Sequence, residues 1–113
     1  DWLISPEINL TNATAASIKF ELWTQYSDAG FPQPMEIYIL ENYTSGDPSS
    51  SATNITSRCA IPAANSKVWT SSGTVDVSDF IGKKVRLALH YRSSGAASST
   101  STLWRVDNVA IDF

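Results

Sequence analysis

The sequence predicts an all-β protein, a sandwich of about seven or eight antiparallel strands. Two observations carry this prediction: apolar residues alternate with polar ones in several segments, and helical periodicity is almost absent. Short turn-rich stretches separate the alternating segments, as they do in antiparallel folds. No internal repeat is evident, which argues against a propeller or a solenoid.

Alternation is clearest in residues 17–26, 35–41 and 83–92. In a strand, every second side chain points to the same face of the sheet. We therefore expect these three segments to supply the core through their odd or even positions. The expected inward side chains are Ile18, Phe20, Leu22, Met35, Ile37, Ile39, Val85, Leu87, Leu89 and Tyr91.

Shorter elements are expected elsewhere. Pro6 divides residues 2–10 into two extended pieces, which is typical of an edge strand or of a kink between short strands. Residues 67–70 and 74–77 predict short strands on either side of a turn. One helical turn is expected to follow, capped by Ser78 and ended by Gly82.

Three segments rich in small and turn-forming residues predict loops: 27–34, 44–57 and 93–101. The longest of them, 44–57, is interpreted as a surface loop inside one domain. The strand pattern resumes after it, and neither half of the chain could bury a core alone. Residues 1–113 are therefore expected to form a single domain.

The last expected strand, residues 102–113, changes phase. Its apolar residues fall on even numbers up to Val106 and on odd numbers from Val109. A regular strand cannot keep both sets on one face, because a slip of one residue turns every side chain over. An extra residue at Asp107 and Asn108, a β-bulge, would reconcile them.

The bulge would place the Asp107 carboxylate among apolar neighbours, where it needs a cation, an arginine or several N–H donors. One hypothesis is a calcium-like ion, with further oxygen ligands from other strands. The other is that Asp107 pairs with Arg105 or another arginine and only pins the fold. In both cases we expect Asp107 to stabilise the fold rather than to take part in catalysis.

Composition excludes several classes of protein. The chain is 42% apolar and 17% charged, which does not suit a disordered acidic segment, and no apolar run is long enough to span a bilayer. A formal net charge of −3 disfavours nucleic acid as a partner. The single cysteine, Cys59, permits neither an intrachain disulfide nor a cysteine metal cluster.

The setting is expected to be extracellular. Serine and threonine greatly outnumber lysine and arginine, and a surface of hydroxyls suits a secreted or cell-surface β-protein. The chain begins at Asp1 with no methionine, so we expect it to be a piece of a longer protein whose targeting segments lie outside it.

Few residues suggest catalysis. His90 is the only histidine and is expected to face solvent or a cross-strand acid, and one His with one Cys does not make a typical zinc site. The sequence has no Gly-x-Ser-x-Gly elbow. Glu21 and Glu36 could supply the carboxylate pair of a glycoside hydrolase, or could be solvated residues with cross-strand partners.

Two aromatic residues are candidates for ligand binding. Trp23 and Tyr38 each lie on the more polar face of an expected strand. Flat rings in that position can stack on sugar rings while nearby acids and amides bond the hydroxyl groups. Alternatively, these rings cover the second face of the sandwich or pack under loops.

Several stretches together resemble a known family. They are DWLISPEINL at residues 1–10, IKFEL at 18–22, VRLAL at 85–89 and WRVDNV at 104–109. The chain resembles the choice-of-anchor and cleaved-adhesin group of bacterial secreted and surface proteins, which is similar in plan to animal MAM domains. The MAM cysteines are missing, and family members commonly carry a further strand before the first of these stretches.

The resemblance implies a jelly-roll domain that is a non-catalytic appendage of a larger protein. It implies a structural calcium ion with ligands at Asp107 and, less directly, Asn108. We expect an accessory module for adhesion or carbohydrate contact, or a spacer, with a glycan, a host or surface protein, or neighbouring domains as partners. A carboxylate-dependent hydrolase and a purely structural module without a ligand are the alternatives.

Overall fold

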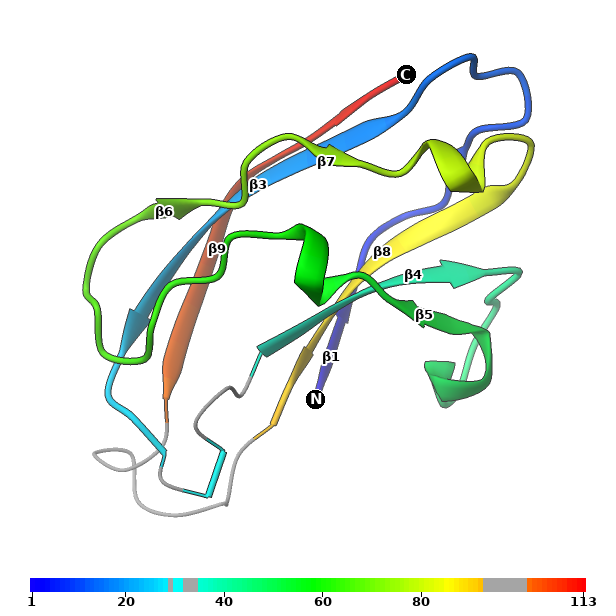
Figure 1. The fold of residues 1–113 in the computed structure, drawn as a ribbon. Helices are drawn as coiled ribbons and strands as arrows, with labels where there is room; N and C mark the ends of the chain where they lie inside the picture. Colours follow the sequence, from blue (N-terminus) through cyan, green and yellow to red (C-terminus); the bar gives the residue numbers. More distant parts are fainter. Residues whose placement is uncertain (29, 32–34, 93–101) are drawn as a thin grey trace.

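The computed structural model describes residues 1–28, 30–31, 35–92 and 102–113 and forms an antiparallel β-sandwich (Figure 1). Its strands are β1 (Trp2–Ile4), β2 (Ile8–Asn9), β3 (Ser17–Gln25), β4 (Met35–Glu41), β5 (Ala52–Asn54), β6 (Thr70–Ser71), β7 (Val75–Asp76), β8 (Lys84–Tyr91) and β9 (Leu103–Asp112). Three single turns of 3-10 helix complete the described part: η1 (Pro48–Ser51), η2 (Thr56–Arg58) and η3 (Ser78–Phe80). The predicted all-β sandwich is confirmed, whereas its jelly-roll connectivity stays a prediction.

Two sheets face each other. In sheet A, β8 lies between β4 and the short strands β1 and β2, and β5 pairs with the far side of β4. In sheet B, β3 is central, with β6 and β7 on one side and β9 along the other. All these pairings are antiparallel, and two of them, β1 with β8 and β3 with β9, join segments that are distant in sequence. Within the described residues, no helix has the length and apolar character of a bilayer-spanning segment.

The core lies between the sheets and consists of the predicted alternating side chains. Phe20, Leu22 and Ile37 are fully buried at its centre. The other predicted inward residues of β3, β4 and β8 are also buried, except Tyr91, which is half-buried. Period-two alternation therefore predicted the core, because each of these strands has one face against the opposite sheet.

Residues 44–57 are more ordered than the predicted surface loop. They contain η1, β5 and η2, and β5 extends sheet A at the edge of β4. Thr56 joins this segment to β4, because its hydroxyl accepts a hydrogen bond of 2.8 Å from the Ile37 amide. The sequence did not distinguish a loop from these short elements, because Ser, Thr, Asn and Asp side chains bond to nearby backbone groups and so favour turns.

Two local predictions need correction. Ser78 lies inside η3 and does not cap it; its hydroxyl oxygen instead accepts from the Ala16 amide at 3.2 Å. The strand expected at residues 67–70 begins only at Thr70, because Lys67 has a φ of 57° and leaves the extended conformation. Gly82, with a φ of 86°, ends the helical turn as predicted.

The predicted bulge in the last strand is confirmed. Lys19 pairs with Ala110, and Glu21 pairs with Asp107. One residue of β3 therefore lies opposite two residues of β9, Asn108 and Val109, and Asn108 has a φ of 52°. The extra residue turns Val106 and Ile111 toward the same core. The predicted loop 93–101 lies outside the described residues, as do Ala29 and residues 32–34 of the predicted loop 27–34.

An exposed ion pair joins η2 to η3. The Arg58 guanidinium donates to both carboxylate oxygens of Asp79, at 2.8 and 2.9 Å. The same guanidinium also bonds the Asp76 carbonyl oxygen at 3.2 Å. The hydrogen bonds from Arg58 lower the pKa of the Asp79 carboxyl group. The pair thus links the connection between β5 and β6 to the connection between β7 and β8.

Phe20→Ala should be among the most destabilising single changes in this chain. It removes a fully buried ring from the middle of β3, and such truncations cost about 3–5 kcal/mol. Urea denaturation followed by circular dichroism measures the loss. The control is Lys19→Ala, whose exposed side chain should leave the free energy of unfolding within about 0.5 kcal/mol. Equal effects of the two changes would contradict the assigned core face of β3.

Asp79→Asn should cost less than about 1 kcal/mol at neutral pH, because both partners are largely exposed and water screens the pair. The folded-state pKa of Asp79 is lowered, so the pair stabilises the fold fully above the unfolded pKa of about 4. This contribution disappears as the pH falls through the folded-state pKa. Urea titrations of both proteins at pH 7 and pH 2 check this. A penalty of equal size at both pH values would exclude an ionic origin.

Candidate functional site

The outer face of sheet A carries three rings side by side: Trp2, Tyr38 and His90. We call them the sheet A platform. Trp2 pairs in register with His90, and β4 lies on the other side of β8. Tyr38 and His90 point outward because Ile37, Ile39 and Leu89 beside them are buried in the core. Trp2 shares this face because it is the register partner of His90. Three strands that are distant in sequence thus bring the rings to one surface.

The rings are in close contact. The Trp2 and His90 rings stack with centroids 4.2 Å apart and planes 7° apart. Tyr38 is tilted by 51° against Trp2, at a centroid distance of 5.2 Å. All three residues are half-buried, so each ring combines packing with an exposed surface. Such packed rings lose little conformational entropy when they contact a ligand.

A polar group of residues borders the platform. Glu36 lies at its centre: one carboxylate oxygen is 3.5 Å from His90 Nδ1 and 3.3 Å from Arg92 Nε. The other oxygen accepts a hydrogen bond of 3.4 Å from the Asn54 amide. In the described part of the chain, His90 Nδ1 is buried without a hydrogen-bond partner. His90 thus faces a cross-strand acid, which is one of the two environments predicted for it.

Tyr38 remains a hydrogen-bond donor over a wide pH range. Partial burial and, secondarily, the charge of Glu36 raise the pKa of its phenol. The hydroxyl is therefore protonated at neutral pH. The platform consequently combines a neutral donor, a carboxylate acceptor, an amide and a guanidinium around its rings.

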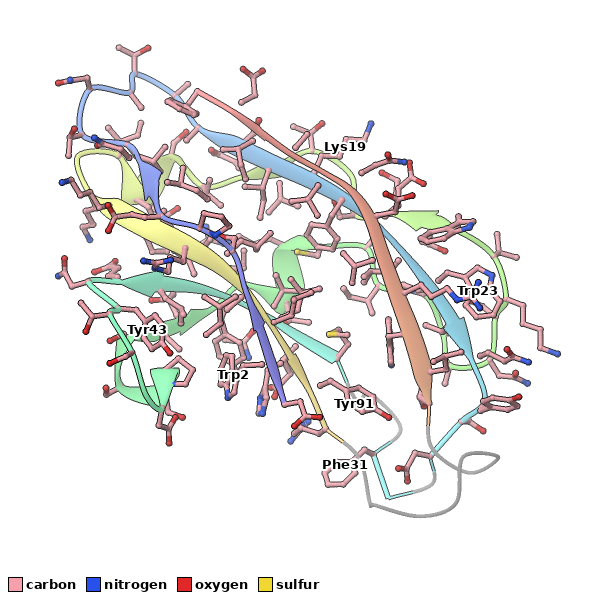
Figure 2. All side chains as sticks on the ribbon, turned by 180° about the vertical axis from the view of Figure 1, so that it is seen from behind. Trp2, Lys19, Trp23, Phe31, Tyr43 and Tyr91 are labelled. Atoms are coloured by element: carbon pink, nitrogen blue, oxygen red, sulfur yellow. The ribbon has the colours of Figure 1, made fainter. Side chains whose placement is uncertain are left out.

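The second aromatic candidate, Trp23, lies on the outer face of sheet B. It is on the opposite side of the sandwich from Trp2 (Figure 2). The Arg105 guanidinium lies over the Trp23 ring, 4.7 Å from its centroid. Such a cation–π contact occupies one face of the ring. Trp23 and Tyr38 therefore do not belong to one site.

The two candidate carboxylates are also separated. Glu21 points outward from β3 in sheet B, whereas Glu36 points outward from β4 in sheet A. A glycoside hydrolase needs its two carboxylates on either side of one bond. Because Glu21 and Glu36 are on opposite outer faces of the sandwich, they cannot flank the same substrate bond.

Cys59 is not an activated nucleophile. Burial raises the pKa of its thiol to about 11. The thiol is therefore protonated at neutral pH, whereas catalytic cysteines have a lowered pKa. Its Sγ lies 3.6 Å from the Ile55 carbonyl oxygen, which suits a packed structural residue.

Asp107 is exposed, and its carboxylate accepts a hydrogen bond of 2.8 Å from the Asn108 amide. The bond lies within the bulge. Among the described residues Asp107 forms no ion pair with an arginine, and Arg105 lies over Trp23 instead. Glu21 is directly opposite Asp107 in the register. Asp107 is thus the last paired residue before the bulge, which Asn108 and Val109 form.

These residues do not fit a closed calcium site. Calcium takes about six to eight oxygen ligands. In residues 1–28, 30–31, 35–92 and 102–113, no group of three or more His, Cys, Asp or Glu side chains could hold a metal ion. Glu21 and Asp107 alone fall short of that requirement. Calcium at Asp107 and Asn108 therefore stays a prediction without support from the surrounding side chains.

Comparison with known proteins gives a likeness among solved structures. No protein-family model matches the chain, and no curated protein matches it. Among solved structures, it is similar to the K1 cleaved adhesin domain of Lys-gingipain from Porphyromonas gingivalis W83. The identity is 24% and the TM-score 0.47, over 98% of this chain and 62% of that one. The present chain thus spans less than two thirds of that domain.

Chelation should show whether Asp107 is a calcium ligand or only accepts the hydrogen bond from the Asn108 amide. A calcium ion bound there would make EDTA lower the melting temperature, and Asp107→Ala would abolish that response. The side chains present around Asp107 lead us to expect the same melting temperature in calcium and in EDTA, measured by differential scanning calorimetry. A fall in EDTA that Asp107→Ala removes, but that the exposed control Asp1→Ala retains, would contradict this expectation and restore the calcium site.

Proposed function

We propose that this chain is a non-catalytic accessory module of a secreted or cell-surface protein, and that it contacts carbohydrate through the sheet A platform. The observation that carries the proposal is the convergence of Trp2, Tyr38 and His90 beside the polar group centred on Glu36. Adhesion is the role that such a contact would serve.

The chemistry of the platform suits a sugar. One face of a pyranose ring presents C–H groups, which pack on aromatic rings, and its hydroxyl groups bond to carboxylates, amides and guanidinium groups. Glu36 can accept such bonds, and Asn54, Arg92 and the Tyr38 hydroxyl can donate them. Polar groups next to a flat apolar surface are the usual composition of a ligand site.

The platform is a better candidate than Trp23. The Arg105 guanidinium already covers one face of the Trp23 ring. A sugar stacking on that face would have to displace a charged group. In contrast, the charged groups at the platform pair beside its rings: Arg92 contacts Glu36 at 3.3 Å, and its guanidinium lies over Phe31, not over a platform ring.

A hydrolytic role is disfavoured by the arrangement of the candidate groups. Glu21 and Glu36 lie on opposite faces of the sandwich, and the Cys59 thiol is protonated at neutral pH. Contact with a surface protein through the same platform, or a spacer role between neighbouring domains, would need no reacting group either. A hydroxyl-rich surface with a net charge of −3 agrees with the extracellular setting.

Glycan binding should depend on sheet A and not on sheet B. We expect selective retention on a glycan array, and Tyr38→Ala should weaken it at least about fivefold, if a stacked sugar contributes about 1–3 kcal/mol as a stacked base does. Glu36→Gln should weaken it as well, since it removes a charged acceptor. Trp23→Ala is the matched control and should bind as the parent chain does.

Three outcomes would contradict the proposal. Loss of binding in Trp23→Ala but not in Tyr38→Ala would place the ligand on sheet B. Release of reducing sugar that Glu36→Gln abolishes would show an enzyme. A chain that retains no glycan would leave adhesion to protein or a spacer role.

A further inference from the structure

The carboxylate of Glu36 is only partly satisfied in the described part of the chain. Its side chain is 22% exposed, so it has lost much of its contact with water. The groups around it lie at 3.3 Å (Arg92 Nε), 3.4 Å (Asn54 amide) and 3.5 Å (His90 Nδ1). Hydrogen bonds from a cationic N–H group to a carboxylate are shorter, about 2.7–2.9 Å. The carboxylate can therefore still accept a closer, charge-assisted hydrogen bond.

Arg92 is a replaceable partner of Glu36. Its side chain is 43% exposed, so water weakens the attraction between the two charges. Its guanidinium also lies over the Phe31 ring, 5.3 Å from the centroid. If another cation took its place beside Glu36, this cation–π contact would still hold the guanidinium. Arg92 thus occupies a position that the positive charge of a ligand can take.

A second carboxylate, that of Asp47, lies beside the platform. Asp47 caps η1, which packs against β4. Hydrogen bonds from Ser49 lower the pKa of the Asp47 carboxyl group, and an electrostatic interaction with His90 lowers it further. Asp47 is therefore ionised at neutral pH and close enough to His90 to act on the platform. Another cation on the outer face of β8, Arg86, instead bonds the Ser5 carbonyl oxygen at 3.1 Å.

The rings of the platform favour a positive charge as well. Tyr38 is two residues from Glu36 on the same face of β4, and its ring contacts that of Trp2. The faces of aromatic rings attract cations, and their apolar surface packs on the C–H groups of a sugar. One ligand satisfies both properties: a pyranose that carries a protonated amino group. Its ring can cover Tyr38 while the amino group donates to Glu36.

We propose that the ligand of the platform is an amino sugar with a free, protonated amino group, and that this group binds Glu36 in place of Arg92. The inference rests on the proposed glycan contact and names the class of sugar. An N-acetylated amino sugar has no such charge, and a neutral hexose offers only hydroxyl groups. A uronic or sulfated sugar would be repelled by Glu36 and Asp47.

Three tetrasaccharides test the charge of the sugar. They share a β-1,4-linked glucose backbone and differ only at carbon 2, which carries a hydroxyl, an acetamido or an amino group. Isothermal titration calorimetry at low ionic strength and pH 6, below the pKa of an aliphatic amino group, measures the affinities. The amino form should bind at least about fivefold more tightly, because its ammonium group adds a charge-assisted hydrogen bond. This ratio should fall in about 1 M NaCl, where charges are strongly screened.

Single variants assign the effect to the platform. Glu36→Gln should make the amino and hydroxyl forms bind alike, because the charged acceptor is gone. Arg92→Gln should raise the ratio about twofold or more, because it removes the competing cation. A purely structural role of Arg92 would not raise the affinity for one of the three sugars. Lys84→Gln is the matched control: it removes a positive charge at the far end of β8 and should leave the ratio unchanged.

Several results would overturn the inference. They are equal or tighter binding of the hydroxyl or acetamido form, a ratio that survives Glu36→Gln in a variant folded by circular dichroism, an unchanged ratio in Arg92→Gln, and no binding of any of the three sugars. The proposed function is tested separately, because it stands as long as the array retains a glycan through Tyr38.

Discussion

The packing of the inner face of β3 against β4 and β8 is the interaction on which the rest of the structure depends. Phe20 and Leu22 are fully buried from one sheet, and Ile37 is fully buried from the other. Because side chains alternate along a strand, burial of these residues also determines which residues point outward. The placement of Tyr38 and His90 on one outer face, and of Trp23 on the other, is a direct consequence.

The strand β9 shows how one extra residue affects several levels of structure. The bulge lets Val106 and Ile111 face the same core although their numbers differ in parity. It also accounts for the exposed Asp107, whose carboxylate accepts a hydrogen bond from the backbone amide of Asn108. Strand geometry accounts for the change of phase, while calcium binding at Asp107 stays a prediction.

The three surfaces of the sandwich differ in chemistry. The outer face of sheet A combines packed rings with a carboxylate, an amide and a guanidinium group, which suits a polyhydroxylated ligand. The outer face of sheet B carries Trp23 under Arg105, where a charged group already covers the ring. The side between β1 and β9 carries an apolar groove lined by Leu3, Leu89, Val106 and Val109 among others.

The sequence by itself determined the fold class, the core residues of β3, β4 and β8, and the position of the bulge, because all of these follow from local alternation of apolar side chains. Only the tertiary structure decided that Trp2 stacks on His90, that Glu36 joins them, and that Glu21 and Trp23 lie on the opposite face. The physical reason is that strand pairing is long-range: the pairing of β1 with β8 joins residues 2–4 to residues 88–90. Alternation predicts which side of its own strand a residue occupies, but not which strand lies beside it.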